Sequence, residues 1–310
     1  MPYFHLCIIL KGNMLGRRSG VEKAVAGKVI SDRQTGHTGH PVAKFIRTPP
    51  RALGSGGYMT TSINSAKQQS DRSLWQGLVG IIDRPRVTFQ SMLQREDWRR
   101  WAVPLLLYLV AFAVLTAVQT PYLRELALQQ ADLQLADLPA DQADAARATM
   151  EFTMSLPFML ATGIIFGGLV LLIGVLAQTA YLYLSAMLAG GRDAGFKTMF
   201  TVSVWSRIPL TIGYLVQAAF VAVSQGALRY PGLAPLVASG NQLEDAGNPL
   251  VALLARVDLF WLWHLVLVSI GLALAARLSR GKSIVLTAVY AGLALAMALI
   301  PALLGRLFGG

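Results

Sequence analysis

The chain runs through 40 residues, 152–191, without a single Asp, Glu, Lys or Arg. A helix needs about 17–25 apolar residues to cross the hydrocarbon core of a bilayer. Further long apolar tracts follow one another from Trp101 onward. Charged residues make up only 14% of the chain, against roughly 25% in soluble domains. These features predict an all-α fold, that of a polytopic helical membrane protein.

The loop charges predict how many times the chain crosses the membrane. An alternative reading breaks the charge-free tract with a hairpin at Gly167-Gly168 and gives six spans. With five spans and a cytoplasmic N-terminus, the inner loops carry ten Lys/Arg and the outer loops five; six spans give eight against seven. Basic loops favour the cytoplasm, and a turn inside lipid leaves backbone groups unpaired. We therefore predict a five-span domain over residues 101–306 with its C-terminus outside, and spans at about 102–118, 157–188, 208–224, 259–276 and 283–304.

Most of the basic excess lies in a leader. Residues 1–58 hold nine Lys/Arg and two Asp/Glu, whereas residues 59–310 hold eighteen against fourteen. The remainder has no basic groove interleaved with aromatic residues, so we expect no nucleic-acid partner. The leader lacks periodicity and is rich in Gly, Arg, Thr and Pro, a composition typical of disordered segments. It also lacks the order of regions found in a secretory signal.

The leader raises two further questions. We hypothesise that its start codon is over-called and that translation begins at Met59. His37 and His40 form a pair that could bind a metal, but a disordered segment is the better interpretation and we expect no metal site. Cys7 is the single cysteine, which excludes a disulfide within one chain.

The cytoplasmic segment 59–100 contains an amphipathic pattern. Trp75, Leu78, Val79 and Ile82 fall at i, i+3, i+4 and i+7, which places them on one face of a helix. This pattern predicts an interfacial helix lying along the bilayer surface. Packing of the same face against the inner loops of the protein fits the pattern as well.

Arg207 lies in the stretch SVWSRIPL, between long apolar runs. A span that begins at Ile208 and ends at Ser224 just reaches the lower length limit. Arg207 would then lie at the cytoplasmic interface and extend to lipid phosphate, with Pro209 in the first helical turn. The alternative is a buried functional charge, which is how an arginine within a span is usually interpreted.

The sequence offers no recognisable catalytic site. It has no HExxH, P-loop, GxSxG or GxGD pattern, and the five predicted spans contain no Lys, Asp or Glu. His264 could shuttle protons, but we predict a packed imidazole bonded to a neighbouring helix. Ser279 and Lys282 have the SxxK spacing, and we interpret them as membrane-surface residues. We therefore predict no catalytic residue, no cofactor and no metal.

Small residues mark predicted helix-packing faces. Gly163, Gly167 and Gly174 lie on one stripe of the second span, and Gly271 and Ala275 lie four apart in the fourth. Small residues let helix backbones approach closely in lipid. Packing within one bundle is the simpler interpretation. A self-association face that makes a homo-oligomer is the alternative.

Three segments carry a resemblance to a known family: IIDRPRVTF, GGRDAGFKTMFTVSVWSRIPLTIG and LFWLWHLVLVSIGLALAARLSRGKS. Their order and spacing over about residues 75–305 resemble the bacterial branch of the YIP domain family, five-span membrane proteins of the Ypt-interacting type. Trp205 stands where these proteins commonly have a Tyr ahead of the proline. The resemblance implies that the family-motif positions are Pro85, Phe89, Gly190, Gly191, Phe196, Pro209, Trp263, Gly271, Ser279, Gly281 and Lys282.

These observations favour a non-enzymatic protein of a bacterial inner membrane. We predict a scaffold or adaptor, embedded in the lipid bilayer, that binds other membrane proteins or organises lipid. Its cytoplasmic face would comprise residues 75–100, 190–207 and 277–283, with interfacial charges at Arg99, Arg100, Arg207, Arg277 and Arg280. One alternative is a small permease or pore that uses Gln119, Gln178 and Gln217. A lipid-modifying membrane enzyme is the second alternative.

Overall fold

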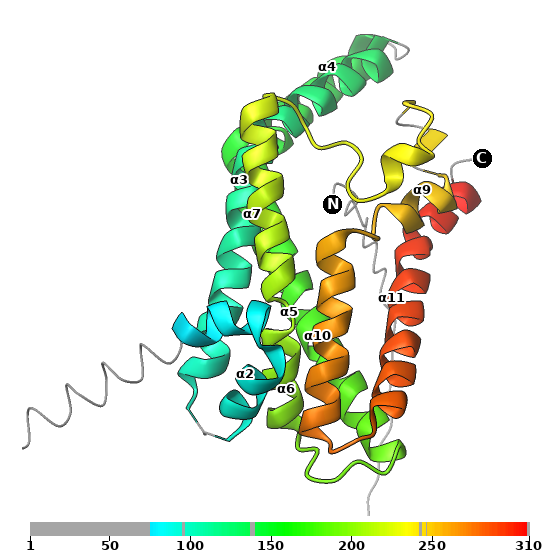
Figure 1. Ribbon diagram of the computed structural model, residues 1–310. Coiled ribbons are helices and arrows are strands. Elements are labelled where there is room, and N and C mark those ends of the chain that lie inside the picture. Colours follow the sequence, from blue (N-terminus) through cyan, green and yellow to red (C-terminus); the bar gives the residue numbers. More distant parts are fainter. Residues whose placement is uncertain (1–74, 95–96, 137–139, 242–243, 246, 309–310) are drawn as a thin grey trace, which may run out of the picture. The chain divides into compact units, whose positions relative to one another are not determined.

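The computed structural model describes residues 75–94, 97–136, 140–241, 244–245 and 247–308. The leader, the start at Met59 and the His37–His40 pair therefore lie outside the described residues. Within those ranges every regular element is a helix, in agreement with the all-α prediction (Figure 1).

Residues 75–83 are helical and lead into the first fully described helix. The elements that follow are α2 (Pro85–Leu93), α3 (Arg99–Ala136), α4 (Ala140–Thr153), α5 (Leu156–Leu188), α6 (Phe196–Trp205), α7 (Ile208–Ser224), the 3₁₀ turn η1 (Ala234–Leu236), α9 (Pro249–Leu254), α10 (Leu259–Ala275) and α11 (Arg280–Phe308).

Each predicted span falls on one of these helices. Four stretches are long and apolar enough to cross a membrane, namely Arg99–Asp132, Leu156–Leu188, Phe196–Ser224 and Arg280–Leu303. The predicted fourth span is α10, a shorter apolar helix of 17 residues. The structure therefore supports a helical membrane protein with four long span candidates and one shorter apolar helix.

The helix boundaries decide two points of the predicted topology. The six-span hairpin at Gly167-Gly168 is wrong, because α5 continues through it for 33 residues. The segment treated as the loop 190–207 is also largely helical: α6 fills most of it and α7 follows almost directly. Met199, Val202 and Trp205 are buried on α6, and their spacing of three residues is the helical signal within this segment.

A glycine pair stops α5. Gly190 has a φ of 77°, a left-handed conformation that favours glycine and commonly ends helices. The Gly191 N–H then donates to the carbonyl oxygen of Ala186 at 2.8 Å. A Cβ on Gly191 would lie 2.8 Å from the same oxygen, so this turn cannot accept a side chain without moving.

The helices pack in a defined set of neighbours. α3 packs against α5 and α7, α10 packs against α7 and α11, and α2 packs against α10 and α6. Figure 1 shows α10 and α11 side by side, with α2 near the end where α10 stops. The short helices that precede the first span are therefore docked onto the bundle at the end where α6 begins.

A carboxylate organises the long connection between α7 and α10. Asp245 accepts hydrogen bonds from the Tyr230 hydroxyl at 2.6 Å, the Ser239 N–H at 2.9 Å and the Gly240 N–H at 3.1 Å. The hydrogen bond from Tyr230, followed by that from Ser239, holds the pKa of Asp245 below its ordinary value of 3.8, because these donors stabilise the charged form.

This lowered pKa predicts an acid-sensitive loop. A carboxyl whose folded pKa is depressed contributes stability that is present above the unfolded pKa, about 3.8, and lost as pH falls through the lower folded pKa. Asp245→Asn should lower the melting temperature at pH 7 and remove part of its fall toward pH 3. Melting curves across this range check the expectation. Glu244→Gln is the control, and an equal effect from it would contradict the assignment to Asp245.

Candidate functional site

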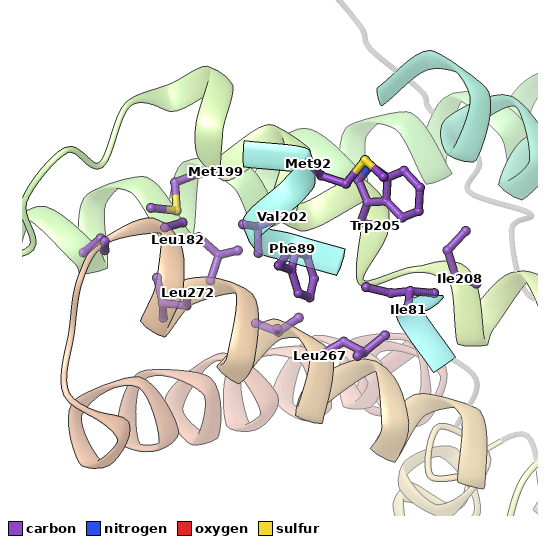
Figure 2. Packing of buried hydrophobic residues seen from close by; sticks show 14 residues of the cluster. Ile81, Phe89, Met92, Leu182, Met199, Val202, Trp205, Ile208, Leu267 and Leu272 are labelled. Atoms are coloured by element: carbon purple, nitrogen blue, oxygen red, sulfur yellow. The ribbon is translucent and has the colours of Figure 1, made fainter. Parts of the chain in front are cut away.

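One end of the bundle carries the segments expected to form the functional face. We call the described residues of 75–100, 190–207 and 277–283 the platform. A buried apolar cluster joins the platform to the bundle (Figure 2). Its largest members are Ile81, Phe89 and Met92 from the first helices, Met199, Val202 and Trp205 from α6, Leu182 from α5, and Leu267 and Leu272 from α10.

Trp205 holds three helices of the platform together. Its ring is fully buried, and its Nε1–H donates to the carbonyl oxygen of Arg100 at 2.7 Å. Arg100 in turn donates from its guanidinium to the Ser91 carbonyl oxygen at 2.8 Å. α6, α3 and α2 are thereby connected by hydrogen bonds inside the cluster. Arg100 is only 6% exposed, so the prediction that it is an interfacial surface charge is wrong.

The two turns of the platform are also bonded to each other. The Arg192 N–H donates to the carbonyl oxygen of Ala276 at 2.9 Å, and Lys282 Nζ donates to that of Ala189 at 2.9 Å. Arg277 and Asp193 form an ion pair at 3.0 Å with both side chains largely exposed, which adds little stability. Hydrogen bonds to two backbone carbonyls therefore fix the relative positions of these turns.

The helix at 75–83 divides its apolar residues between two sides. Ile81 is fully buried and Leu78 packs against the cluster. Trp75 and Val79 remain 69% and 68% exposed, and Ile82 is exposed as well. Of the predicted face, Leu78 therefore packs on the protein, whereas contact of the exposed residues with the bilayer surface stays a prediction.

The outer surface of the platform combines aromatic and basic groups. Trp98 is exposed and lies under the Arg99 guanidinium at 5.9 Å from the ring centre. Arg277 and Arg280 are exposed as predicted, and Phe196 is half-exposed. This surface can offer cation–π and charge contacts to a partner.

A buried polar cluster lies beneath the platform, at the break between α6 and α7. His264 is 1% exposed, and its Nδ1 donates to the carbonyl oxygen of Ser206 at 2.8 Å. Gln178 is also buried and donates from Nε2 to the Ser206 hydroxyl at 3.4 Å. His264 is therefore a packed, hydrogen-bonded imidazole, as the sequence analysis expected.

Arg207 lies inside the bundle. Its side chain is 7% exposed, its guanidinium donates to the Gly174 carbonyl oxygen at 3.0 Å, and it lies 5.4 Å from the Tyr108 ring centre. The outward-reaching side chain expected of a boundary residue is therefore not what the structure has. The physical reason is that α6 continues the apolar helical stretch on the other side of Arg207, which leaves the side chain between α3 and α5.

The polar cluster retains unsatisfied atoms. Among the described atoms, Gln178 Oε1, Arg207 Nε and His264 Nε2 are buried and have no hydrogen-bond partner. Unsatisfied buried polar atoms cost free energy unless water or a ligand pairs with them. The sequence singled out these three residues separately. It missed their convergence on one helix break, for which the only local signal is Pro209.

The glutamines proposed to line a pore make separate contacts. Gln178 belongs to the cluster at Ser206. Gln119 is buried and donates to the Leu228 carbonyl oxygen at 3.5 Å. Gln217 is partly exposed on α7. Two of the three side chains therefore have a structural partner.

The family-motif positions have identifiable structural roles. Pro85 opens α2, Gly190 and Gly191 end α5, Phe196 opens α6, and Pro209 lies in the first turn of α7. Phe89 and Gly271 meet in the buried cluster, against which Trp263 also packs. Ser279, Gly281 and Lys282 lie at the turn into α11, where the Lys282 N–H donates to the Ser279 hydroxyl.

The predicted packing glycines differ in their surroundings. A Cβ on Gly167 would lie 2.4 Å from the Phe112 ring, and one on Gly163 would lie 3.1 Å from Thr116, so both glycines face α3 closely. A Cβ on Gly174 would meet nothing within 4 Å. The contribution of Gly174 is its carbonyl, which accepts from Arg207. Gly271 and Ala275 lie in the buried cluster.

Gly167→Leu should weaken packing of α5 on α3. The added side chain overlaps the Phe112 ring, and such overpacking typically costs about 1–3 kcal/mol. We expect a lower melting temperature in detergent. Gly174→Leu is the matched control on the same helix, because its site is open, and it should change little. Equal melting temperatures for the two variants would contradict this packing.

The family model of the Yip1 domain matches residues 79–303, which include every described family-motif position. No curated protein matches the chain, and no solved structure does. Within the described ranges, no group of three His, Cys, Asp or Glu residues is arranged to hold a metal ion.

Proposed function

Because the chain belongs to the Yip1 domain family of multi-pass integral membrane proteins, we propose that it is a non-enzymatic scaffold or adaptor in a bacterial inner membrane. Its platform binds other membrane proteins, and the bundle anchors that surface in the bilayer. The observation that carries this proposal is the construction of the platform. Three segments distant in sequence are joined by the buried cluster and by the Trp205–Arg100 hydrogen bond.

A preassembled surface supports adaptor function because a partner does not have to order it. The exposed groups that surround the cluster are suited to protein contacts: aromatic residues and arginine are enriched at interfaces. Trp75, Trp98 and Phe196 supply the aromatic part, and the exposed Arg277 together with the half-buried Arg99 supplies the basic part.

The proposal includes a five-span topology with the platform in the cytoplasm. α10 has 17 residues, which is the lower limit of about 17–25 for a membrane helix. The platform is rich in arginine and lysine, and such segments are retained on the cytoplasmic side. An odd number of spans then places the end of α11 outside.

The experiment compares two pairs of charge-removing substitutions in the full chain. Arg99→Gln with Arg277→Gln changes the platform, whereas Arg147→Gln with Arg229→Gln removes the same charge from exposed positions away from the platform. Cross-linked membrane proteins recovered with the purified variants are quantified by mass spectrometry. We expect the platform pair to lower recovery of a specific partner at least about tenfold, as loss of interface hot spots does. Equal recovery from both pairs contradicts the proposal.

A second candidate function, a small permease, is favoured by one observation. Gln178, Arg207 and His264 present unsatisfied polar atoms inside the bundle, and polar groups within a membrane protein commonly mark a solute path. The test is flux of small polar solutes into liposomes. A flux that Gln178→Leu abolishes supports this candidate, and a flux equal to that of empty liposomes rejects it.

A further inference from the structure

A groove of about 620 Å³ lies along α10 and α11, the two helices that run side by side in Figure 1. The volume is in the range of about 300–1,000 Å³ that is common for ligand sites. Its walls are mainly aliphatic, and two of the wall residues, Val266 and Ile284, are 54% and 59% exposed. The groove is therefore open along a side of the bundle.

Two arginines of the platform line the groove, and Arg280 stands at one end of it. Arg280 is the first residue of α11, and Arg86 comes from α2 of the platform. Both side chains are exposed, and neither forms an ion pair with any acidic side chain in the described part of the chain. Guanidinium groups bind phosphate through paired, charge-assisted hydrogen bonds. This end is suited to a phosphate that two arginines share.

Hydroxyl groups follow deeper in the groove. The Ser269 and Ser283 hydroxyls are 3.3 Å apart. Thr287, one turn further along α11, is 6% exposed, and its Oγ1 has no hydrogen-bond partner among the described atoms. A threonine within a helix commonly donates to the carbonyl four residues earlier. Thr287 does not, and the residue lines the groove with its Oγ1 buried and unpaired among the described atoms.

The length of the groove corresponds to one leaflet. The helical rise of about 1.5 Å per residue places Ala291 about 16 Å from Arg280 along α11. One leaflet contributes half of the hydrocarbon core, which is about 30 Å thick, so its thickness is similar to this length. The arginines therefore mark the surface end and Ala288 and Ala291 the end toward the middle of the bilayer.

We infer that this groove binds one anionic diacyl phospholipid from the leaflet on the platform side. Its phosphate bonds to Arg86 and Arg280, an ester carbonyl accepts from the Thr287 hydroxyl, and an acyl chain lies along the aliphatic walls of α10 and α11. The order of groups along the groove, cationic, then hydroxyl, then aliphatic, is the order of complementary groups in such a lipid. This site goes beyond the protein-binding role of the platform and does not depend on it.

The test uses the purified full chain in detergent, titrated with phosphatidylglycerol or with phosphatidylcholine, and native mass spectrometry to count bound lipid. We expect the wild type to retain one phosphatidylglycerol in preference to phosphatidylcholine. Arg86→Gln with Arg280→Gln should lower that retention at least about tenfold, because both phosphate contacts are lost. Arg84→Gln with Arg277→Gln removes the same charge outside the groove and should retain the lipid. Equal loss in the two pairs overturns the inference.

A second variant tests the acyl-chain part with both arginines present. Ala288→Trp fills the groove from an exposed position and should also prevent retention of phosphatidylglycerol. Unchanged retention in Ala288→Trp, equal binding of the two lipids, or full displacement of phosphatidylglycerol by inorganic phosphate would each overturn the inference. Dimers without lipid would overturn it as well, because a second copy would then cover the groove.

Discussion

Trp205→Ala is expected to destabilise the protein by about 3–5 kcal/mol, the range for removing a buried aromatic side chain. Trp205 is fully buried in the cluster beneath the platform and donates to the Arg100 carbonyl oxygen. Its loss leaves a cavity and removes this hydrogen bond. The packing part of this cost persists in a membrane protein, because van der Waals contact holds helices together in lipid. Thermal unfolding of the purified protein in detergent measures the effect.

Two further variants separate the contributions at this position. Trp205→Phe retains much of the ring volume but loses the hydrogen bond, which should cost about 1 kcal/mol beyond the lost volume. Trp98→Ala removes an exposed tryptophan of the same platform and should change the melting temperature little. If Trp98→Ala were as destabilising as Trp205→Ala, the cluster would not be what holds the platform.

Gly271→Leu is expected to separate α10 from α6 and α2. A Cβ at Gly271 would lie 2.6 Å from Val202 Cγ1 and 3.1 Å from the Phe89 ring. Both neighbours belong to the buried cluster, so they have little room to move. We expect the free energy of unfolding to fall by about 3 kcal/mol, the upper end of the range for overpacked cores. The platform should also unfold in part. Limited proteolysis of residues 75–100 and melting temperature measure the two parts.

Gly292→Leu is the control for this substitution. Gly292 lies on α11, and a Cβ there would meet nothing within 4 Å. The added side chain is the same, and the variant should melt near the wild-type temperature and leave residues 75–100 protected from proteolysis. Protection of the same segment in Gly271→Leu would contradict close packing at that position.

The sequence predicts the helices of the bundle well because lipid imposes a simple requirement. A long charge-free tract in a bilayer must form a helix, since all backbone groups need internal partners. Most of the tract at 152–191 accordingly forms the single helix α5, Leu156–Leu188, and the predicted boundaries Ile208 and Ser224 are those of α7. The glycine at 167 also packs closely, as small residues in such helices do.

The parts that the sequence does not predict depend on contacts between distant segments. Arg100 and Arg207 are interpreted as surface charges from their neighbours in sequence. In the structure both are buried: Trp205 of α6 bonds to Arg100, and the Arg207 side chain lies between α3 and α5. His264 and Gln178 meet only at Ser206, 58 and 28 residues away. Local periodicity in the sequence does not predict such contacts between distant residues. They arise when α6 folds back onto α3 and α10.

The groove proposed for lipid has the same origin. Arg86 and Arg280 are almost two hundred positions apart in the chain, and both line the groove along α10 and α11. Thr287 has no distinctive signal in its sequence surroundings. Its unpaired hydroxyl is evident only from the packing of α11.

Site-specific photo-crosslinking in living cells tests directly whether the platform binds other membrane proteins. Probes at Val87, Trp98 and Phe196 report on exposed platform positions. Probes at Val223, in the last turn of α7, and at Leu236, in η1, report on exposed positions away from the platform. We expect one abundant membrane protein to be cross-linked from the platform probes and not from the other two. Recovery of lipid alone from the platform probes, or the same proteins from both sets, would contradict it.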